Sequence, residues 1–167
     1  VVADNCKPDL KEDERTQLIL LTEKLGKGSN SAGLVRNEGM KKNIMIASSV
    51  EDLRKKKQTE WIGFVDDNDT VSPHYVEYLN KYDADIVIFR MFHPRHNGPG
   101  HLLPPPGATD FKNMLVGISF AVKTSFYKKH ELYFKPNPAE DFYYLDKARR
   151  LGAEIIIAEE TAYYVDA

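Results

Sequence analysis

The sequence contains a single cysteine, Cys6, among its 167 residues. One cysteine cannot form a disulfide bond within the chain, so nothing in the sequence requires an oxidising compartment. No apolar run approaches the roughly 20 residues that a membrane-spanning helix needs, and no segment has the pattern of a signal peptide. We therefore expect a cytoplasmic location and no membrane span.

An excess of charge of either sign is also missing. The 23 basic and 25 acidic side chains leave a formal net charge of −2, whereas binding to a nucleic acid backbone needs a basic surface. The short basic cluster at residues 54–57 is typical of a solvated helix end. We expect no nucleic acid partner.

The apolar content is sufficient for one folded domain. Hydrophobic residues make up 42% of the sequence, which is enough to build a buried core in a chain of this length. No internal repeat divides the sequence. We expect a single domain over residues 1–167.

The strongest local pattern is WIGFVDDNDT, residues 61–70. Trp61 to Val65 is a short run of uncharged residues that favour β-structure, which predicts a buried strand. Four polar residues follow at once: Asp66, Asp67, Asn68 and Asp69. Carboxylates this close repel one another, so a fold that keeps them ionised usually supplies a cation. Hard oxygen ligands suit Mg²⁺, Mn²⁺ or Ca²⁺, and Mg²⁺ is commonly shared with substrate phosphates.

The position of these acids also favours a ligand site, because ligands bind at the carboxyl ends of strands in open α/β sheets. We interpret residues 66–69 as a metal–phosphate site. A solvated turn is the alternative, since Asp and Asn dominate turns. A calcium-binding loop is a weaker one, because its sixth position requires glycine and Val71 stands there.

Apolar runs and amphipathic stretches alternate along the chain, which predicts an α/β fold. The order strand, helix, strand over residues 61–92 predicts parallel pairing with a right-handed crossover. The expected strands are residues 1–3, 17–22, 61–65, 85–92, 114–122, 155–158 and 162–165. The expected helices are residues 11–17, 38–57, 74–82 and 138–151, the last opened by Asn137 and stopped by Gly152.

Residues 93–107, HPRHNGPGHLLPPPG, are rich in proline and glycine. This composition predicts a long surface loop or lid. The histidines within it match no zinc spacing, so we expect a loop on the substrate side rather than a metal site.

Two further stretches carry residues suited to anions and proton transfer. Residues 26–39 are rich in glycine, which lets backbone approach a ligand closely. Arg36 and Asn37 lie near the expected helix start, where anions are favoured and arginine adds bidentate reach; an ion pair between Arg36 and a nearby acid is the alternative. Glu140 and Asp141 lie in the first turn of another helix, where the dipole stabilises acids whatever their role.

In their order along the chain, four motifs resemble those of the glycosyltransferase family 2 type of nucleotide-sugar transferase. They are VVADNCKPD, SAGLVRNEG, WIGFVDDNDTVSP and EDFYYLDKARRLG, at Val1–Asp9, Ser31–Gly39, Trp61–Pro73 and Glu140–Gly152. Each motif is loose alone, but together they span nearly the whole chain.

The resemblance implies a GT-A-like (Rossmann-related) single domain whose mostly parallel central sheet is flanked by helices. It implies a glycosyltransferase of the hexosyltransferase type that depends on Mn²⁺ or Mg²⁺. The sugar would pass, with inversion, from a nucleoside-diphosphate sugar, first of all a UDP-sugar, to a hydroxyl group of a glycan or other acceptor.

The resemblance also implies roles on the nucleotide side. Asp4 would hydrogen-bond the nucleotide base, and Arg36 would lie near the base or the diphosphate. Asp66 would lie by the ribose, with Asp67 beside it in the nucleotide-sugar site.

For the metal and the chemistry, the resemblance implies that Asp67 and Asp69 share the cation that bridges the diphosphate. Which of these acids binds the metal directly stays open, because Asn68 stands where aspartate is common. Asp141 would be the catalytic base, with Glu140 beside it.

The sequence departs from the family pattern at its start. The family's first strand has no counterpart before Val1, so we expect the chain to begin inside the fold. This leaves a nucleotide-sugar-binding module without catalysis as an alternative. A second alternative is a haloacid-dehalogenase-like phosphatase, in which the first aspartate after the strand is the nucleophile.

Overall fold

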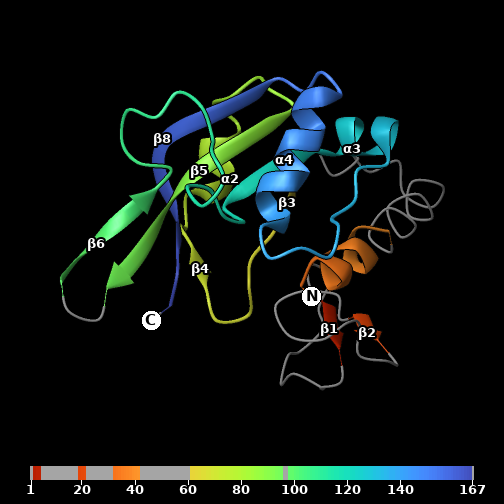
Figure 1. The fold of residues 1–167 in the computed structure, drawn as a ribbon, viewed down its shortest axis with the longest axis horizontal. Helices are drawn as coiled ribbons and strands as arrows, with labels where there is room; N and C mark the ends of the chain where they lie inside the picture. The colour runs from red at the N-terminus through yellow and green to blue at the C-terminus, as the bar shows by residue number, and fades with distance from the viewer. Residues whose placement is uncertain (1, 5–18, 22–31, 42–60, 96–97, 167) are drawn as a thin grey trace. The chain divides into compact units, whose positions relative to one another are not determined.

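A computed structural model of the chain describes residues 2–4, 19–21, 32–41, 61–95 and 98–166. The chain falls into two compact units (Figure 1). The first comprises Val1–Thr59 with Tyr133–Glu140, and the second Glu60–Leu132 with Asp141–Ala167. That both units act as one domain stays a prediction. Within the described ranges, no helix is long and apolar enough to cross a membrane.

The described residues of the first unit form two short strands and a helical segment. Strands β1 (Val2–Asp4) and β2 (Ile19–Leu21) pair in parallel, with Val2 opposite Ile19. Both lie where the apolar runs predict them. Residues 32–41 are helical, so this helix includes residues well before the expected start at residue 38. The rest of the expected helix 38–57 lies outside the described residues, as does the helix expected at residues 11–17.

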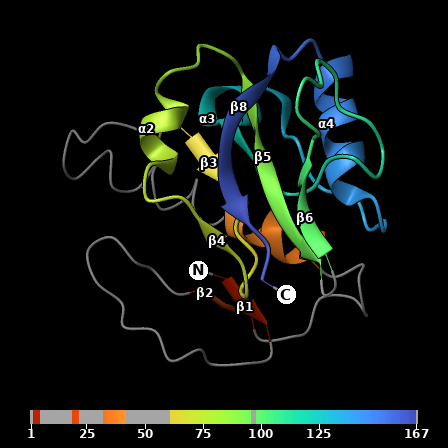
Figure 2. The same ribbon diagram turned by 90° about the vertical axis from the view of Figure 1, so that its left-hand side faces the viewer.

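The described strands of the second unit form a six-stranded sheet. Its central strands lie side by side in Figure 2, and the order is β3-β7-β5-β8-β4, with β6 paired to β5. The strands are β3 (Trp61–Gly63), β4 (Thr70–Val71), β5 (Ile86–Arg95), β6 (Gly98–Leu103), β7 (Phe120–Lys123) and β8 (Ile155–Tyr164).

The strand directions correct the expectation of a mostly parallel sheet. Among the described strands of this unit, β5 and β8 pair in parallel, whereas the pairs β3–β7, β5–β7, β5–β6 and β4–β8 are antiparallel. Strands β3 and β5 do run in the same direction, as the strand, helix, strand order predicts. They are not neighbours, because the apolar strand β7 lies between them and pairs with both.

The described helices beside this sheet are α2 (Tyr75–Leu79), α3 (Thr124–His130) and α4 (Glu140–Arg150). The start of α4 follows the expected cap, because the Asn137 side chain accepts the backbone N–H of Ala139 at 2.9 Å. Its end follows the expected glycine stop, because Gly152 has a φ of +86°, a left-handed conformation that glycine adopts without strain.

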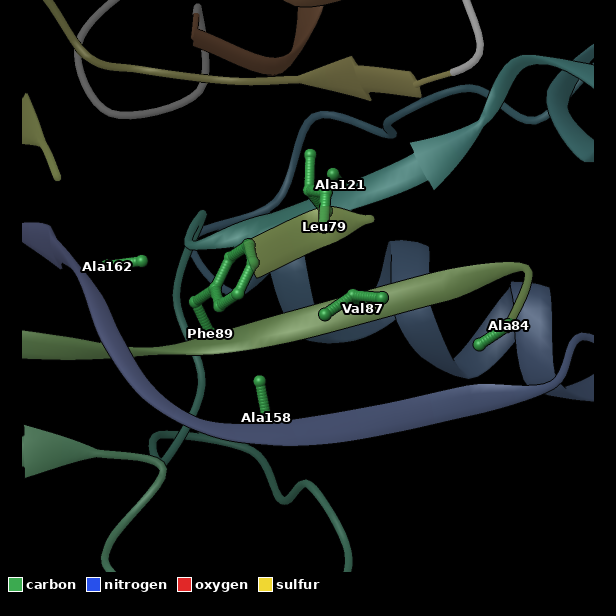
Figure 3. Close-up of a cluster of buried hydrophobic side chains, with 7 residues drawn as sticks. All are labelled: Leu79, Ala84, Val87, Phe89, Ala121, Ala158 and Ala162. Carbon is green, nitrogen blue, oxygen red and sulfur yellow. The ribbon is translucent and has the colours of Figure 1, made fainter. Parts of the chain in front are cut away.

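Side chains of both sheet faces are buried. On one face Val87 and Phe89 of β5 pack with Leu79 of α2 and with small residues of the neighbouring strands (Figure 3). On the other, the ring of Phe120 stacks on Tyr144 of α4 at 5.4 Å between centroids. The sheet is therefore enclosed by α2 on one side and α4 on the other (Figure 2).

The segment expected to be a long loop is largely a β-hairpin. Strand β5 continues to Arg95, and β6 pairs back along it with Met91 opposite Leu103. The register shifts near Pro94, where the missing proline N–H would interrupt a regular ladder. Gly100 is required by close packing, because a Cβ there would overlap the Phe92 ring. Proline and glycine in this segment mark an irregular hairpin, and a lid stays a prediction.

Candidate functional site

The acidic residues lie on a short connection between β3 and β4. The backbone N–H of Asp69 donates to the carbonyl of Asp66 at 3.1 Å, which closes a turn. Asp67 and Asn68 are exposed at its tip, and in the part of the chain that the structure describes neither side chain forms a hydrogen bond. The strand followed by an acidic turn is thus where the sequence predicts it.

Tyr163 of β8 forms hydrogen bonds with two residues of this turn. Its side chain is fully buried, and its hydroxyl accepts the backbone N–H of Asp66 at 3.1 Å. The same hydroxyl donates to Oδ2 of Asp69 at 2.7 Å. Burial, and then the hydrogen bond to Asp69, raise the pKa of Tyr163 well above its usual value. The hydroxyl therefore keeps its proton and remains a donor at neutral pH.

The second oxygen of Asp69 is also engaged. Oδ1 accepts the backbone N–H of Asp166 at 3.0 Å. Further along the connection, the backbone N–H of Ser72 donates to the carbonyl of Ala162 at 3.0 Å. The end of β8 thus fixes both sides of the acidic turn.

Sequence reasoning missed the contribution of Tyr163 and Asp166. Tyr163 lies in an apolar run that predicts only a strand, and its hydroxyl is the one local signal of a polar role. Asp166 contributes through its backbone, which carries no sequence signal.

The donor set fits a hard divalent cation shared with a ligand. Among the described residues, no group of three or more His, Cys, Asp or Glu side chains converges to hold a metal. A cage made by protein alone is therefore not preformed there. Mg²⁺-type ions are, however, commonly held by one or two carboxylates plus substrate phosphates. Each oxygen of Asp69 keeps a lone pair after its hydrogen bond, and the Asp67 carboxylate is exposed.

In the first unit, Arg36 and Glu140 form an ion pair. Arg36 Nη1 lies 2.5 Å from Glu140 Oε1, and the two side chains are only 12% and 7% exposed. The other oxygen, Oε2, accepts the backbone N–H of Gly33 at 2.9 Å. The ion pair that the sequence left as the alternative for Arg36 is thus present, and both oxygens of Glu140 are engaged.

Asn37 also connects the helical residues 32–41 to residues 133–140. Its Nδ2 donates to the carbonyl of Phe134 at 2.9 Å, and its Oδ1 accepts the N–H of Phe134 at 2.8 Å. The Arg36 guanidinium lies over the Phe134 ring, 5.5 Å from its centroid. The Arg36-Asn37 pair, which the sequence suggests as an anion site, therefore ties residues 133–140 to the helical residues 32–41.

The remaining site residues are placed but their roles stay predictions. Asp4 ends β1, opposite Leu21, and its side chain lies outside the described part of the structure. Asp141 lies half-buried in the first turn of α4. The structure thus brings together Asp66 with Asp69, and Arg36 with Glu140. The nucleotide, metal and base roles expected for these residues stay predictions.

No protein-family model matches the chain, and no curated protein matches it. Solved structures do match, among them S. aureus TarS 1-349, a glycosyltransferase, with 19% identity and a TM-score of 0.58. That match covers 89% of this chain and 43% of the TarS chain. TarS 1-349 in complex with UDP matches with 18% identity, a TM-score of 0.58 and coverages of 90% and 43%. The complex with UDP-GlcNAc matches with 19% identity, a TM-score of 0.59 and coverages of 89% and 41%.

This chain spans less than half the length of the TarS chains that it matches. At this level of identity the likeness shows the fold alone: this chain shares the fold of TarS, and its main sheet is mixed.

Proposed function

We propose that this chain is a glycosyltransferase domain that moves a sugar from a nucleoside-diphosphate sugar to an acceptor hydroxyl. The donor that we propose is a UDP-sugar. The observation that carries the proposal is the shared fold with TarS, a protein solved in complex with UDP and with UDP-GlcNAc. The match extends over 89% or more of this chain. The four sequence motifs support the same function independently, because they are defined by residue pattern and do not depend on the fold.

The acidic turn would form the donor side of the site. Asp67 and Asp69 would hold Mn²⁺ or Mg²⁺, and Asp66 would lie by the ribose. A cation bound there would act as a Lewis acid that stabilises the departing diphosphate. The two hydrogen bonds to Asp69 keep its carboxylate in place before any ligand arrives, so little reorganisation is needed on binding.

Asp141 would be the base that removes the proton from the acceptor hydroxyl. Attack of that hydroxyl on the anomeric carbon, opposite the diphosphate, would invert the configuration. Glu140 is a weaker candidate for the base, because both of its oxygens already accept hydrogen bonds. We assign Glu140 the role of holding the start of α4, from which Asp141 projects.

Arg36 and Asp4 would contribute on the nucleotide side. Arg36 is paired with Glu140 and nearly buried. Its role in binding would therefore be to fix the helical residues 32–41, which include Gly33, rather than to bind phosphate directly. Asp4, at the end of β1, would hydrogen-bond the base.

Calorimetry with UDP-GlcNAc tests donor binding. We expect binding in the presence of MnCl₂ and an affinity at least about tenfold lower in EDTA. The variant Asp67→Asn should lose the metal-dependent part of the affinity. Asp110→Asn is the matched control, because Asp110 is an exposed acid outside residues 66–69 whose carboxylate pairs with Arg149. Failure of UDP-, GDP- and CMP-sugars to bind the wild-type chain would overturn the proposal.

Release of UDP separates catalysis from binding alone. We expect the wild-type chain to hydrolyse the bound UDP-sugar slowly, with water as the acceptor of the sugar, and so to release UDP, and Asp141→Asn to bind the donor without releasing UDP. Binding without release in the wild type would favour a nucleotide-sugar-binding module.

A further inference from the structure

The end of β8 supports the acidic turn through hydrogen bonds from Tyr163 and Asp166. The backbone of this strand pairs with β4, with Val71 opposite Tyr163 and Thr70 opposite Tyr164. Before β4, residues 66–69 belong to no strand in the described part of the chain, and Tyr163 and Asp166 contact them through individual hydrogen bonds. The hydrogen bonds to Tyr163 and Asp166 therefore contribute to the conformation of residues 66–69.

The hydroxyl of Tyr163 makes two of these bonds, and they act on opposite ends of the turn. As an acceptor it fixes the backbone N–H of Asp66, and as a donor it fixes Oδ2 of Asp69. A phenylalanine at this position would fill the same buried space, so packing does not require the hydroxyl. What the hydroxyl adds is the orientation of the turn.

The bond from Asp166 cannot supply that orientation alone. It reaches only Oδ1 of Asp69, and a carboxylate held at one oxygen can rotate about that contact. With Oδ2 also held by Tyr163, the plane of the carboxylate is defined. The tip of the turn, with the exposed Asp67, then lies in a fixed place relative to Asp69.

We propose that Tyr163 is a positioning residue for the cation site, whose buried hydroxyl sets the Asp66–Asp69 turn in the conformation that receives the metal with the donor diphosphate. This inference rests on the proposed function, because that function brings a cation to the turn. Hydrogen-bond partners that orient metal ligands typically change metal affinity by about 10- to 100-fold when they are removed.

The test compares Tyr163→Phe with Tyr164→Phe. The control removes a neighbouring hydroxyl on the same strand, one that donates to the carbonyl of Thr161 and is exposed. The measured quantity is the ratio of UDP affinity with MnCl₂ to UDP affinity in EDTA. We expect Tyr163→Phe to lower this ratio by about tenfold or more, and Tyr164→Phe to leave it unchanged.

The ratio separates positioning from a merely structural role. Loss of structure would weaken UDP binding with and without metal alike, and would leave the ratio as it is. An unchanged ratio in Tyr163→Phe, with the wild-type ratio well above one, would overturn the proposal.

Amide hydrogen exchange gives a readout that needs no ligand. In the wild-type chain the amide of Asp66 should be protected, because it donates to Tyr163. In Tyr163→Phe it should exchange about tenfold faster or more, while the amide of Ser72, bonded to Ala162, should not change. An unprotected Asp66 amide in the wild type would overturn the proposal even if the variant failed to fold.

The affinity ratio and the amide exchange together also distinguish a failure of this inference from a failure of the proposed function. If wild-type UDP binding proved independent of metal, the proposed metal site would fail, and the cation role of Tyr163 with it. Faster exchange at Asp66 would then still identify Tyr163 as the residue that orders the turn, and unchanged exchange would reject that as well.

Discussion

The carboxylate of Glu140 accepts the backbone N–H of Gly33, 107 positions earlier in the chain, at 2.9 Å. Gly33 lies near the start of the helical residues 32–41, where N–H groups lack partners within the helix. A negative charge is also favourable at that end of a helix. Because the second oxygen of Glu140 meets Arg36, one carboxylate joins two parts of the first unit.

Gly33→Ala should destabilise the fold. A Cβ at this position would overlap the Glu140 carboxylate and lie 2.8 Å from Cβ of Phe134, so the helical segment and residues 134–140 would have to separate. We expect the free energy of unfolding to fall by about 1–3 kcal/mol, although alanine is the better helix former. Urea denaturation measures this, and a stability equal to or above the wild type would contradict the packing of Gly33 against Glu140.

The adjacent acids Glu140 and Asp141 should respond differently to neutral substitution. Glu140→Gln removes the charge that faces the nearly buried Arg36, so we expect the free energy of unfolding to fall by about 3 kcal/mol. Asp141→Asn should change stability much less and should abolish UDP release. Denaturation and UDP release, measured on both variants, distinguish the roles. A stable Glu140→Gln chain that no longer releases UDP would reverse them.

Asn37→Asp should expose the role of the Asn37 amide. The aspartate could still accept the N–H of Phe134, but its second oxygen would replace Nδ2 and face the carbonyl of Phe134. A buried donor would become a buried charge against an acceptor, and we expect a loss of about 2–3 kcal/mol in the free energy of unfolding. Asn113→Asp is the control, because Asn113 is exposed and should tolerate the charge. Equal stabilities of the two variants would contradict the assigned contacts.

Local sequence signals predicted the elements whose ends are set by local chemistry. The strand at Trp61, the acidic turn after it and the α4 helix are where the pattern places them. For α4 the reasons are the Asn137 cap and the left-handed Gly152, which depend on residues a few positions apart. The α/β class follows from the same local patterns.

Strand partners could not be predicted in this way. The apolar character of β7 predicts a strand, but not that it pairs antiparallel with both β3 and β5. The hairpin of β5 and β6 was missed because prolines and glycines usually break strands. Here a register shift near Pro94 and the packing of Phe92 over Gly100 accommodate them.

In the candidate site, too, the sequence identifies individual residues but not their long-range partners. The sequence identifies Arg36 and Glu140 as charged residues of interest, but their pairing joins positions 104 residues apart and only the fold reveals it. Tyr163 was missed because a buried tyrosine in an apolar run is usually a core residue, and its partner turn lies 94 or more positions away.

The contact between Tyr82 and Glu160 should make stability fall in alkaline solution. The Tyr82 hydroxyl donates to Glu160 Oε2 at 2.5 Å. Burial, and then this hydrogen bond, raise the pKa of Tyr82 to about 12, against about 10 in an unfolded chain. Because the folded state holds the proton more tightly, the contribution of this hydrogen bond to stability is fully present below about pH 10 and is lost as the pH rises through about 12.

The variant Tyr82→Phe lacks this group, while the other tyrosines remain in both chains. We therefore expect the difference in unfolding free energy between wild type and Tyr82→Phe, measured by urea denaturation, to shrink across that interval. A difference that stays constant with pH would show that the Tyr82 proton is not bound more tightly in the folded state.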